Sequence, residues 1–441
     1  MKKRATPVSN EAEGSSLARE EKRPKTGGPQ EPRNNNEYKG FSLPILTKAS
    51  GEITCNFKVP VEPASISPKD FFEKYVATRT PCIIDGLPPS NPTIITPDIV
   101  KEHAGSVQVQ VEKRYSRDEL FGQNRTPSRQ FVPSISDFVD GLRSEDGDLL
   151  YLSTQQPTKE NDEQTITPSP FEGPCQTLVD KGLLPKALSW AGHMILQSCN
   201  LWMGSSVKGS CSGLHHDYHD NFYLLFEGRK QFRLFSPDMA ADMYTYGKID
   251  CIHPNGLISH AGNELRADGV PLELLQKTEG VDEDEEDEEE EELVLGKGFD
   301  YESSDSEDEG VFDKAVLEED DENVKDDYDE VVGDDEDEEK DTKNNARPDS
   351  FSQVDLLLPK EDLSKKFPDF PHSVECVVDL KADQSLYLPA SWFHCVTSFA
   401  ETSSKKQPTH TAINYWYHTP DKLDSYNNPY LDDFWKKQRN I

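Results

Sequence analysis

The chain has 441 residues, a formal net charge of −36 and a hydrophobic content of 34%. This hydrophobic content is low for a wholly globular protein, so part of the chain is expected to lie outside any packed core. No apolar run approaches the ~18–20 residues that span a bilayer, and the charged N-terminus lacks the apolar stretch of a secretion signal, which argues against a membrane or secreted protein.

Most of the negative charge lies in one segment. Residues 279–341 hold 35 acidic residues against four lysines, a net charge of −31. Like charges at this density repel one another and stay solvated, so residues 278–345 are expected to form a disordered acidic insertion. The remainder of the chain carries a charge of −5, which is ordinary for a soluble domain. Neither a membrane nor a nucleic acid is an expected direct partner.

The first 38 residues are rich in charged and small residues and nearly free of aromatic ones, which predicts a disordered tail. Two basic clusters, at residues 2–4 and 22–25, have the layout of a bipartite nuclear import signal, although short basic runs are common in such tails. Nuclear localisation is therefore expected, with the cytoplasm as the alternative. Eight scattered cysteines without a C-x-x-C pair indicate reduced thiols rather than a disulfide framework or a zinc site.

Ordered sequence begins near Phe41. Residues 70–86 have apolar positions at helical spacing, a break at Pro81 and then a short buried strand that ends at Gly86. Residues 107–115 alternate as a strand, residues 134–142 read as a helix capped by serine or aspartate, and residues 148–154 read as another strand.

Many short strands with Gly and Pro between them follow, and strand-like sequence resumes after the acidic segment near Phe351. This pattern predicts a mainly β domain, a sandwich or barrel, with helices near its N-terminal end. The folded part is expected to be one domain in two segments, 39–277 and 346–441, interrupted by the acidic insertion.

A candidate metal site lies in "SCSGLHHDYHDNFYLLFEGRKQF", residues 210–232. Residues two apart on a strand share a face, so His215 and Asp217 can converge on one ion while His216 points away. They would supply two corners of a 2-His-1-carboxylate site, which leaves coordination positions open. An isolated H-x-D is more often a surface coincidence.

The third corner requires a histidine from another strand. His394 in "LYLPASWFHCVTS" sits in an apolar and aromatic strand, where an unpartnered imidazole is costly to bury. The alternatives are a core histidine bonded to a backbone carbonyl and a strand-end histidine in solvent.

Lys230 lies on the same strand face as Phe232 and Leu234, which is the more apolar face of "KQFRLFSP". A lysine on an interior face needs an anionic partner, and an acidic small molecule beside the metal would supply one. A lysine at the hairpin edge with its ammonium in water is the alternative.

Together these residues carry a family resemblance. The segment from Asn200 to Pro237, followed by "LYLPASWFHCVTS" and "AINYWY", resembles the Jumonji-C family, specifically its small cupin-like protein-hydroxylase branch. "FFEKYVATRTPCIIDG" is similar to the segment that commonly opens these domains. The resemblance implies a double-stranded β-helix, a jelly-roll fold with flanking helices.

The resemblance also implies the co-substrate and the site. It makes His215, Asp217 and His394 the Fe(II) ligands, and Lys230 the partner of the distal carboxylate of 2-oxoglutarate, with molecular oxygen as the second co-substrate. Ser212 stands where many members have a threonine that binds this carboxylate. The further pocket residues that it implies are Asn221, Asn414, Trp416 and Tyr151, with Ser153, Gln155 and Gln156 only partly reproducing the pattern around Tyr151. Trp202 is expected to pack in the core.

The favoured hypothesis is an Fe(II)- and 2-oxoglutarate-dependent dioxygenase that hydroxylates a side chain of a protein substrate. A lysine or arginine demethylase acting on histones is the alternative in the same class, although the sequence has no zinc-binding cysteine cluster of the kind that many demethylases carry. A non-catalytic, acidic nuclear interaction protein is the alternative of another class, because acidic segments commonly bind basic proteins such as histones or ribosomal proteins.

Overall fold

The computed structural model describes residues 38–47, 53–89, 93–122, 129–154, 169–279, 347–401 and 407–439. The tail up to residue 37, Gln155, Gln156 and the acidic sequence from 280 to 346 lie outside these residues. The chain divides into one unit of Met1–Pro271 with Arg347–Ile441 and a second of Leu272–Ala346. Helix α5, Leu272–Glu279, is the described part of the second unit.

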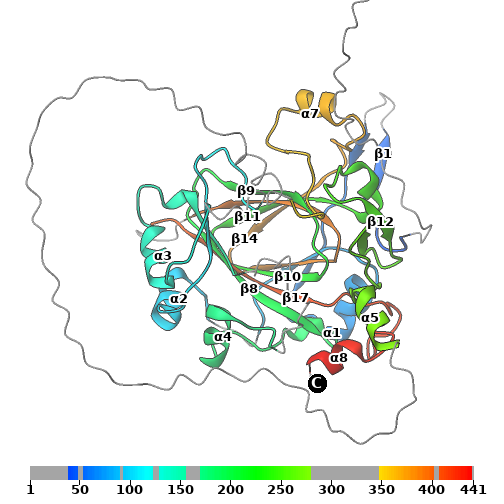
Figure 1. The fold of residues 1–441 in the computed structure, drawn as a ribbon, viewed down its shortest axis with the longest axis horizontal. Coiled ribbons are helices and arrows are strands. Elements are labelled where there is room, and N and C mark those ends of the chain that lie inside the picture. Colours follow the sequence, from blue (N-terminus) through cyan, green and yellow to red (C-terminus); the bar gives the residue numbers. More distant parts are fainter. Residues whose placement is uncertain are drawn as a thin grey trace, which may run out of the picture. The chain divides into compact units, whose positions relative to one another are not determined.

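Two β-sheets dominate the larger unit, as Figure 1 shows, and confirm the expected mainly β fold of the double-stranded β-helix type. The larger sheet contains, in spatial order, β3 (Val61–Pro63), β4 (Cys82–Asp85), β15 (Gln384–Leu388), β10 (Asp220–Glu227), β17 (His410–Tyr417), β8 (Leu196–Gly204), β7 (Leu150–Ser153), β5 (Val111–Lys113) and β6 (Gln130–Phe131). The smaller sheet contains β14 (Cys376–Lys381), β11 (Arg229–Phe235), β16 (Phe393–Phe399) and β9 (Ser210–His215). Two hairpins are formed by β1 (Ile45–Thr47) with β2 (Ile53–Cys55) and by β12 (Ile249–Ile252) with β13 (Ile258–His260).

Short helices accompany the sheets: α1 (Pro68–Phe71) with a π-helical continuation (Phe72–Val76), α2 (Pro97–Ala104), α3 (Ile135–Gly141), α4 (Gly173–Asp180), α7 (Lys360–Lys366) and α8 (Phe434–Arg439). Side-chain oxygens of Ser67, Thr96 and Ser134 cap the N-termini of α1, α2 and α3. The Ser134 cap is the one that the sequence predicts. Each cap satisfies a backbone N–H that the helix leaves unpaired.

Alternation along β10 separates two apolar cores. Phe222 and Phe226 pack in a core with residues of α1, α3 and α4. Tyr223 and Leu225 point the opposite way and pack with residues of the smaller sheet. The sequence of β10 is apolar along most of its length because both faces of this central strand are buried. We call the face of the larger sheet that carries Tyr223 its inner face.

The strand predicted for residues 107–115 is shorter in the structure. Regular pairing is confined to β5, while Gln108 makes an isolated bridge with Ser134 and the Val109 N–H donates to the Pro133 carbonyl. The residues just before α3 therefore pair with the positions that a longer β5 would include. The strand predicted for 148–154 begins with a 3₁₀ turn and becomes β7 at Leu150.

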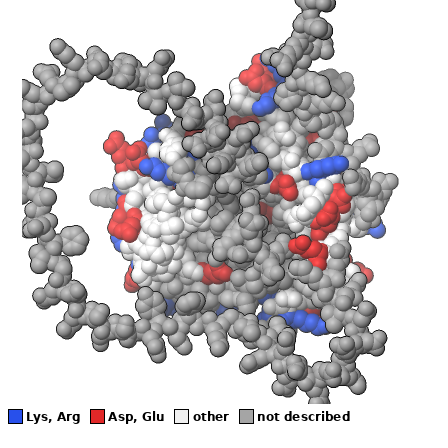
Figure 2. All heavy atoms as spheres, viewed as in Figure 1, with Lys and Arg blue, Asp and Glu red and all other residues white. Residues whose placement is uncertain are grey.

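Charged side chains of both signs lie interspersed on the face shown in Figure 2. Exposed ion pairs such as Lys101–Asp140, with an N···O distance of 2.6 Å, join surface elements. Exposed pairs contribute only ~0–1 kcal/mol each, so the buried cores stabilise the fold far more than these pairs do. Among the described residues, no helix is both long and apolar enough to cross a membrane.

Candidate metal centre

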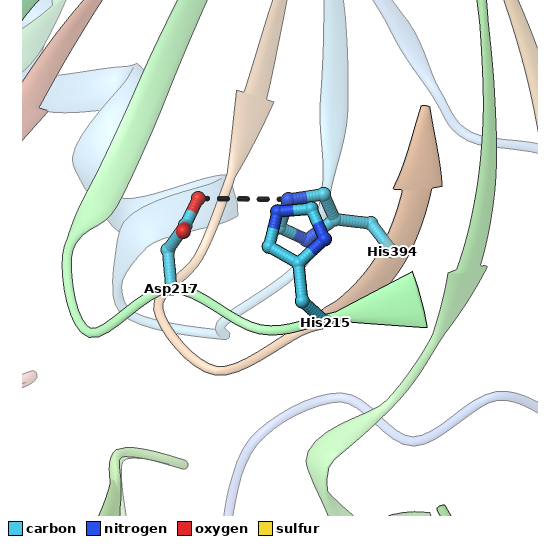
Figure 3. A group of neighbouring side chains, drawn as sticks. All are labelled: His215, Asp217 and His394. Atoms are coloured by element: carbon cyan, nitrogen blue, oxygen red, sulfur yellow. Dashed lines mark ion pairs between the residues drawn. The ribbon is translucent and has the colours of Figure 1, made fainter. Parts of the chain in front are cut away.

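Strand pairing brings the three proposed ligands together. His215 at the end of β9 is the direct register partner of His394 in β16, and their ring centroids are 4.3 Å apart. Asp217 completes the group, with Oδ2 3.5 Å from His394 Nε2. One ligand atom from each residue lies within 4.8 Å of the other two, and Figure 3 shows the three side chains converging.

Asp217 reaches this position differently from the expected strand alternation. Strand β9 ends at His215, and Asp217 lies in the turn that leads into β10. Two backbone bonds hold the turn: His216 N–H donates to Ser350 O at 3.1 Å, and Ser391 N–H donates to Asp217 O at 2.7 Å. His216 is buried outside the ligand group, with its Nε2 3.0 Å from His260 Nε2.

Both ligand imidazoles are oriented by backbone carbonyls. His215 Nδ1 lies 3.2 Å from Gly213 O, and His394 Nδ1 lies 2.9 Å from Trp392 O. A proton on each Nδ1 satisfies these carbonyls and leaves each Nε2 lone pair for a metal. Two imidazole nitrogens and one carboxylate from one side fit a divalent iron-type centre with open positions.

A β-bulge places Ser212 beside this site. In the pairing of β9 with β16, Leu214 opposes Cys395 and Cys211 opposes Thr397, so Ser212 and Gly213 together face Val396. Gly213 has φ +78, a conformation that glycine adopts without steric cost. The extra residue lets Ser212 share a face with His215 although they are three positions apart. Its hydroxyl accepts from Val396 N–H at 3.3 Å.

Lys230 is fully buried rather than extended into solvent. Its ammonium donates to Ser398 Oγ at 2.5 Å and lies 5.6 Å from the ring centroid of Tyr151. The continuous pairing of β11 with β16 sets Lys230 opposite Ser398 and Leu234 opposite His394, so lysine and ligand histidine share one sheet face. Burial lowers the pKa of Lys230 to about 7, and no carboxylate among the described residues raises this pKa again.

The other proposed pocket residues lie on the inner face of the larger sheet. Asn414 donates from Nδ2 to Asn221 Oδ1 at 3.2 Å and accepts from Trp202 Nε1 at 2.8 Å. Trp202 thus supports an amide as well as packing beside the core. Trp416 stacks on His219 with centroids 5.7 Å apart, and its buried Nε1–H has no partner among the described residues.

Two further residues, which the sequence pattern did not single out, also lie near Lys230. Ser398 is the hydroxyl that the ammonium contacts, and His410 is a fully buried imidazole whose ring centroid is 5.8 Å from that of Tyr151. Neither ring nitrogen of His410 has a partner within the described part of the chain. The alternation of His410, Asn414 and Trp416 in "HTAINYWY" places them on one face and was the available signal.

The fold and this site can be compared with known proteins. Residues 68–423 match the family described as the cupin-like domain. The chain is 33% identical over 444 aligned residues to "JmjC domain-containing protein 4" of Schizosaccharomyces pombe, covering 87% of this chain and 90% of that protein. The cupin-like match spans the three candidate metal ligands and Lys230.

Proposed function

Because the chain belongs to the cupin-like, JmjC-domain family, we propose that it is an Fe(II)- and 2-oxoglutarate-dependent oxygenase that hydroxylates a side chain of a protein substrate. The observation that carries this proposal is the convergence of His215, Asp217 and His394, with one ligand atom of each within 4.8 Å of the others. Members of the family commonly have this co-substrate requirement.

The surroundings of Lys230 support a dicarboxylate as co-substrate. Among the described residues, the buried Lys230 ammonium has no carboxylate partner, and neither ring nitrogen of the nearby His410 has a hydrogen-bond partner. A buried ammonium is costly unless an anion binds beside it. In the proposed complex, Lys230 pairs with the distal carboxylate of 2-oxoglutarate while the ligand triad holds the metal. Ser212, between the two, offers a hydroxyl to the same molecule.

Bound iron would supply the oxidising chemistry, in which 2-oxoglutarate, oxygen and a substrate C–H group become succinate, carbon dioxide and a C–OH group. The protein's own contribution is orientation. The carbonyls of Gly213 and Trp392 orient the two imidazole rings that would hold the metal. Asn221 and Trp416 are register partners on the inner face of the larger sheet.

Succinate formation tests this function directly. Purified protein with Fe(II), ascorbate and 2-oxoglutarate is expected to release succinate, and mass spectrometry of basic nuclear proteins treated with it is expected to find one added oxygen atom on a side chain. Loss of a methyl group with release of formaldehyde would instead identify a demethylase. Absence of succinate from metal-loaded, folded protein would leave the non-catalytic interaction protein as the better description.

We propose that the acidic sequence recruits a basic protein and is not part of the catalytic machinery, which the density of charge in residues 279–341 supports. Deletion of residues 281–341 is expected to leave succinate formation without protein substrate within about twofold of the full chain, since inserted loops are tolerated at slowly growing entropic cost. Capture of histones or ribosomal proteins is expected to fall and to become insensitive to salt. Loss of basal succinate formation would contradict the proposal.

A further inference from the structure

A buried ion pair joins the turn before β4 to the first residue of β10. Arg79, in the turn between the π-helical segment and β4, and Asp220, at the start of β10, are both fully buried. Arg79 donates from Nη2 to Asp220 Oδ1 at 2.6 Å and from Nη1 to Asp220 Oδ2 at 2.8 Å. The Tyr387 hydroxyl donates to Asp220 Oδ2 at 2.7 Å. This bidentate pair has a fixed geometry that a lysine cannot reproduce.

We infer that Arg79 is a positioning residue for the metal centre, connected through hydrogen bonds to the turn carrying Asp217 and to the ring of His394. The inference rests on the proposed metal-dependent function. It concerns a residue 138 positions before Asp217 in the sequence, whose guanidinium donates to Asn255 O, to the Asp220 carboxylate and to the Tyr387 hydroxyl.

The first connection runs through the Asp220 carboxylate. Its Oδ1 accepts from the Ala390 N–H at 3.0 Å, and the next N–H, of Ser391, donates to the Asp217 carbonyl at 2.7 Å. The turn before β16 is therefore held against both ends of the Asp217–Asp220 segment. Without the guanidinium, the carboxylate would be an unpaired buried charge and could not keep this arrangement.

The second connection runs through the Arg79 backbone. Trp392 Nε1–H donates to Arg79 O at 3.2 Å, and Trp392 O accepts from His394 Nδ1 at 2.9 Å. The carbonyl that sets the His394 tautomer thus belongs to a residue fixed by Arg79. Partners of this kind around a ligand histidine typically change metal affinity ~10–100-fold when they are lost.

Backbone conformation points to the same network. Arg79 has φ +57 and Ser391 has φ +60, values that residues other than glycine rarely adopt. The Ser391 side chain is also held, because its Oγ accepts from Ile258 N–H at 2.9 Å. Such conformations persist where surrounding contacts over-determine them, and they cluster at functional sites.

Two substitutions test this inference on the full-length protein, with Co(II) as the metal probe. Arg79→Lys keeps the charge but not the bidentate geometry, and Trp392→Phe removes the indole N–H together with part of the buried ring. We expect Arg79→Lys to weaken Co(II) binding by on the order of 10-fold and Trp392→Phe by severalfold, each with a changed visible Co(II) spectrum. Arg114→Lys is the matched control, because Arg114 is also buried but donates to carbonyls of Arg117, Glu119 and Asp148.

A purely structural role would lower the melting temperature and leave the Co(II) spectrum and affinity of the folded variants unchanged, and this result would overturn the inference. If Arg79→Lys does not fold, Trp392→Phe decides by the same readout. Wild-type protein that binds Co(II) but forms no succinate would refute the proposed function, while the spectra of the variants would still decide the positioning role. Wild-type protein that binds no Co(II) would refute both.

Discussion

Replacing His215 with alanine is expected to abolish succinate formation and to weaken Fe(II) binding by more than ~100-fold, beyond the loss caused by removing a hydrogen-bond partner of a ligand. The remaining donors, Asp217 Oδ2 and His394 Nε2, lie 3.5 Å apart and would pair with each other instead of holding an ion from three directions. A centre with two protein donors loses the facial geometry that fixes which positions stay open.

The fold should survive this change. The His215 ring is partly exposed and stacks on Phe351 at a centroid distance of 4.7 Å, so its truncation removes limited packing. His193→Ala is the matched control, since His193 is exposed and contacts Tyr426 rather than the ligand group. Metal affinity measured by Co(II) absorption, together with thermal unfolding, separates loss of the site from loss of the fold. Turnover or affinity of His215→Ala within about threefold of wild type would refute the metal assignment.

The mainly β fold class could be predicted because strand alternation, as in "KQFRLF", is readable in a few residues. The H-x-D spacing paired His215 with Asp217, but the distant partner, His394, came from the family resemblance. The buried position of Lys230 followed from the apolar character of Phe232 and Leu234 on the same face, and the structure places all three inside.

Other features depend on strand order and backbone irregularity, which short patterns do not encode. The bulge at Gly213 aligns Ser212 with His215 against simple alternation, and Asp217 acts from a turn held by Ser391. In β17 all eight residues are buried, so hydropathy alone could not tell which face His410 would occupy. The π-helical continuation Phe72–Val76 and the burial of Arg79 likewise follow from tertiary contacts.

Binding of 2-oxoglutarate is expected to weaken above pH 7, because the partner ammonium is lost. Burial lowers the pKa of Lys230 to about 7, so the free protein holds a neutral amine at higher pH. A carboxylate favours the ammonium and raises its pKa, so binding takes up a proton. The dissociation constant should therefore rise by up to about tenfold per pH unit between pH 7 and the pKa of the complex.

The neighbouring titratable groups do not account for such a slope. Burial raises the pKa of the Tyr151 and Tyr223 phenols, which therefore stay neutral through this window. Burial, aided by the nearby Lys230 charge, holds the pKa of His410 well below its ordinary value, so its imidazole is already neutral at pH 7. Calorimetry with Mn(II)-loaded protein at pH 8, in buffers of different ionisation enthalpy, would measure the proton uptake directly.

Stability of the ligand-free protein should change in the opposite direction. Between pH 7 and about 10.4, the ordinary lysine pKa, the unfolded chain binds the Lys230 proton and the folded chain does not. The unfolded state then binds more protons, so the Lys230 contribution to the free energy of unfolding rises with pH across this window, and the burial cost is complete below pH 7. Added 2-oxoglutarate should stabilise most at the low end of the same window.

Two substitutions test whether Lys230 causes the pH dependence of 2-oxoglutarate binding. Lys230→Met removes the charge and is expected to weaken 2-oxoglutarate binding at pH 7 by on the order of 100-fold or more, because a buried carboxylate without its partner costs about 3–5 kcal/mol. Its binding should no longer vary between pH 7 and 9. Lys230→Arg keeps a positive charge throughout this range, so it should bind better than Lys230→Met and also without the slope. A wild-type pH slope in either variant would mean that another group titrates, and Lys230 would then not be the partner of the distal carboxylate.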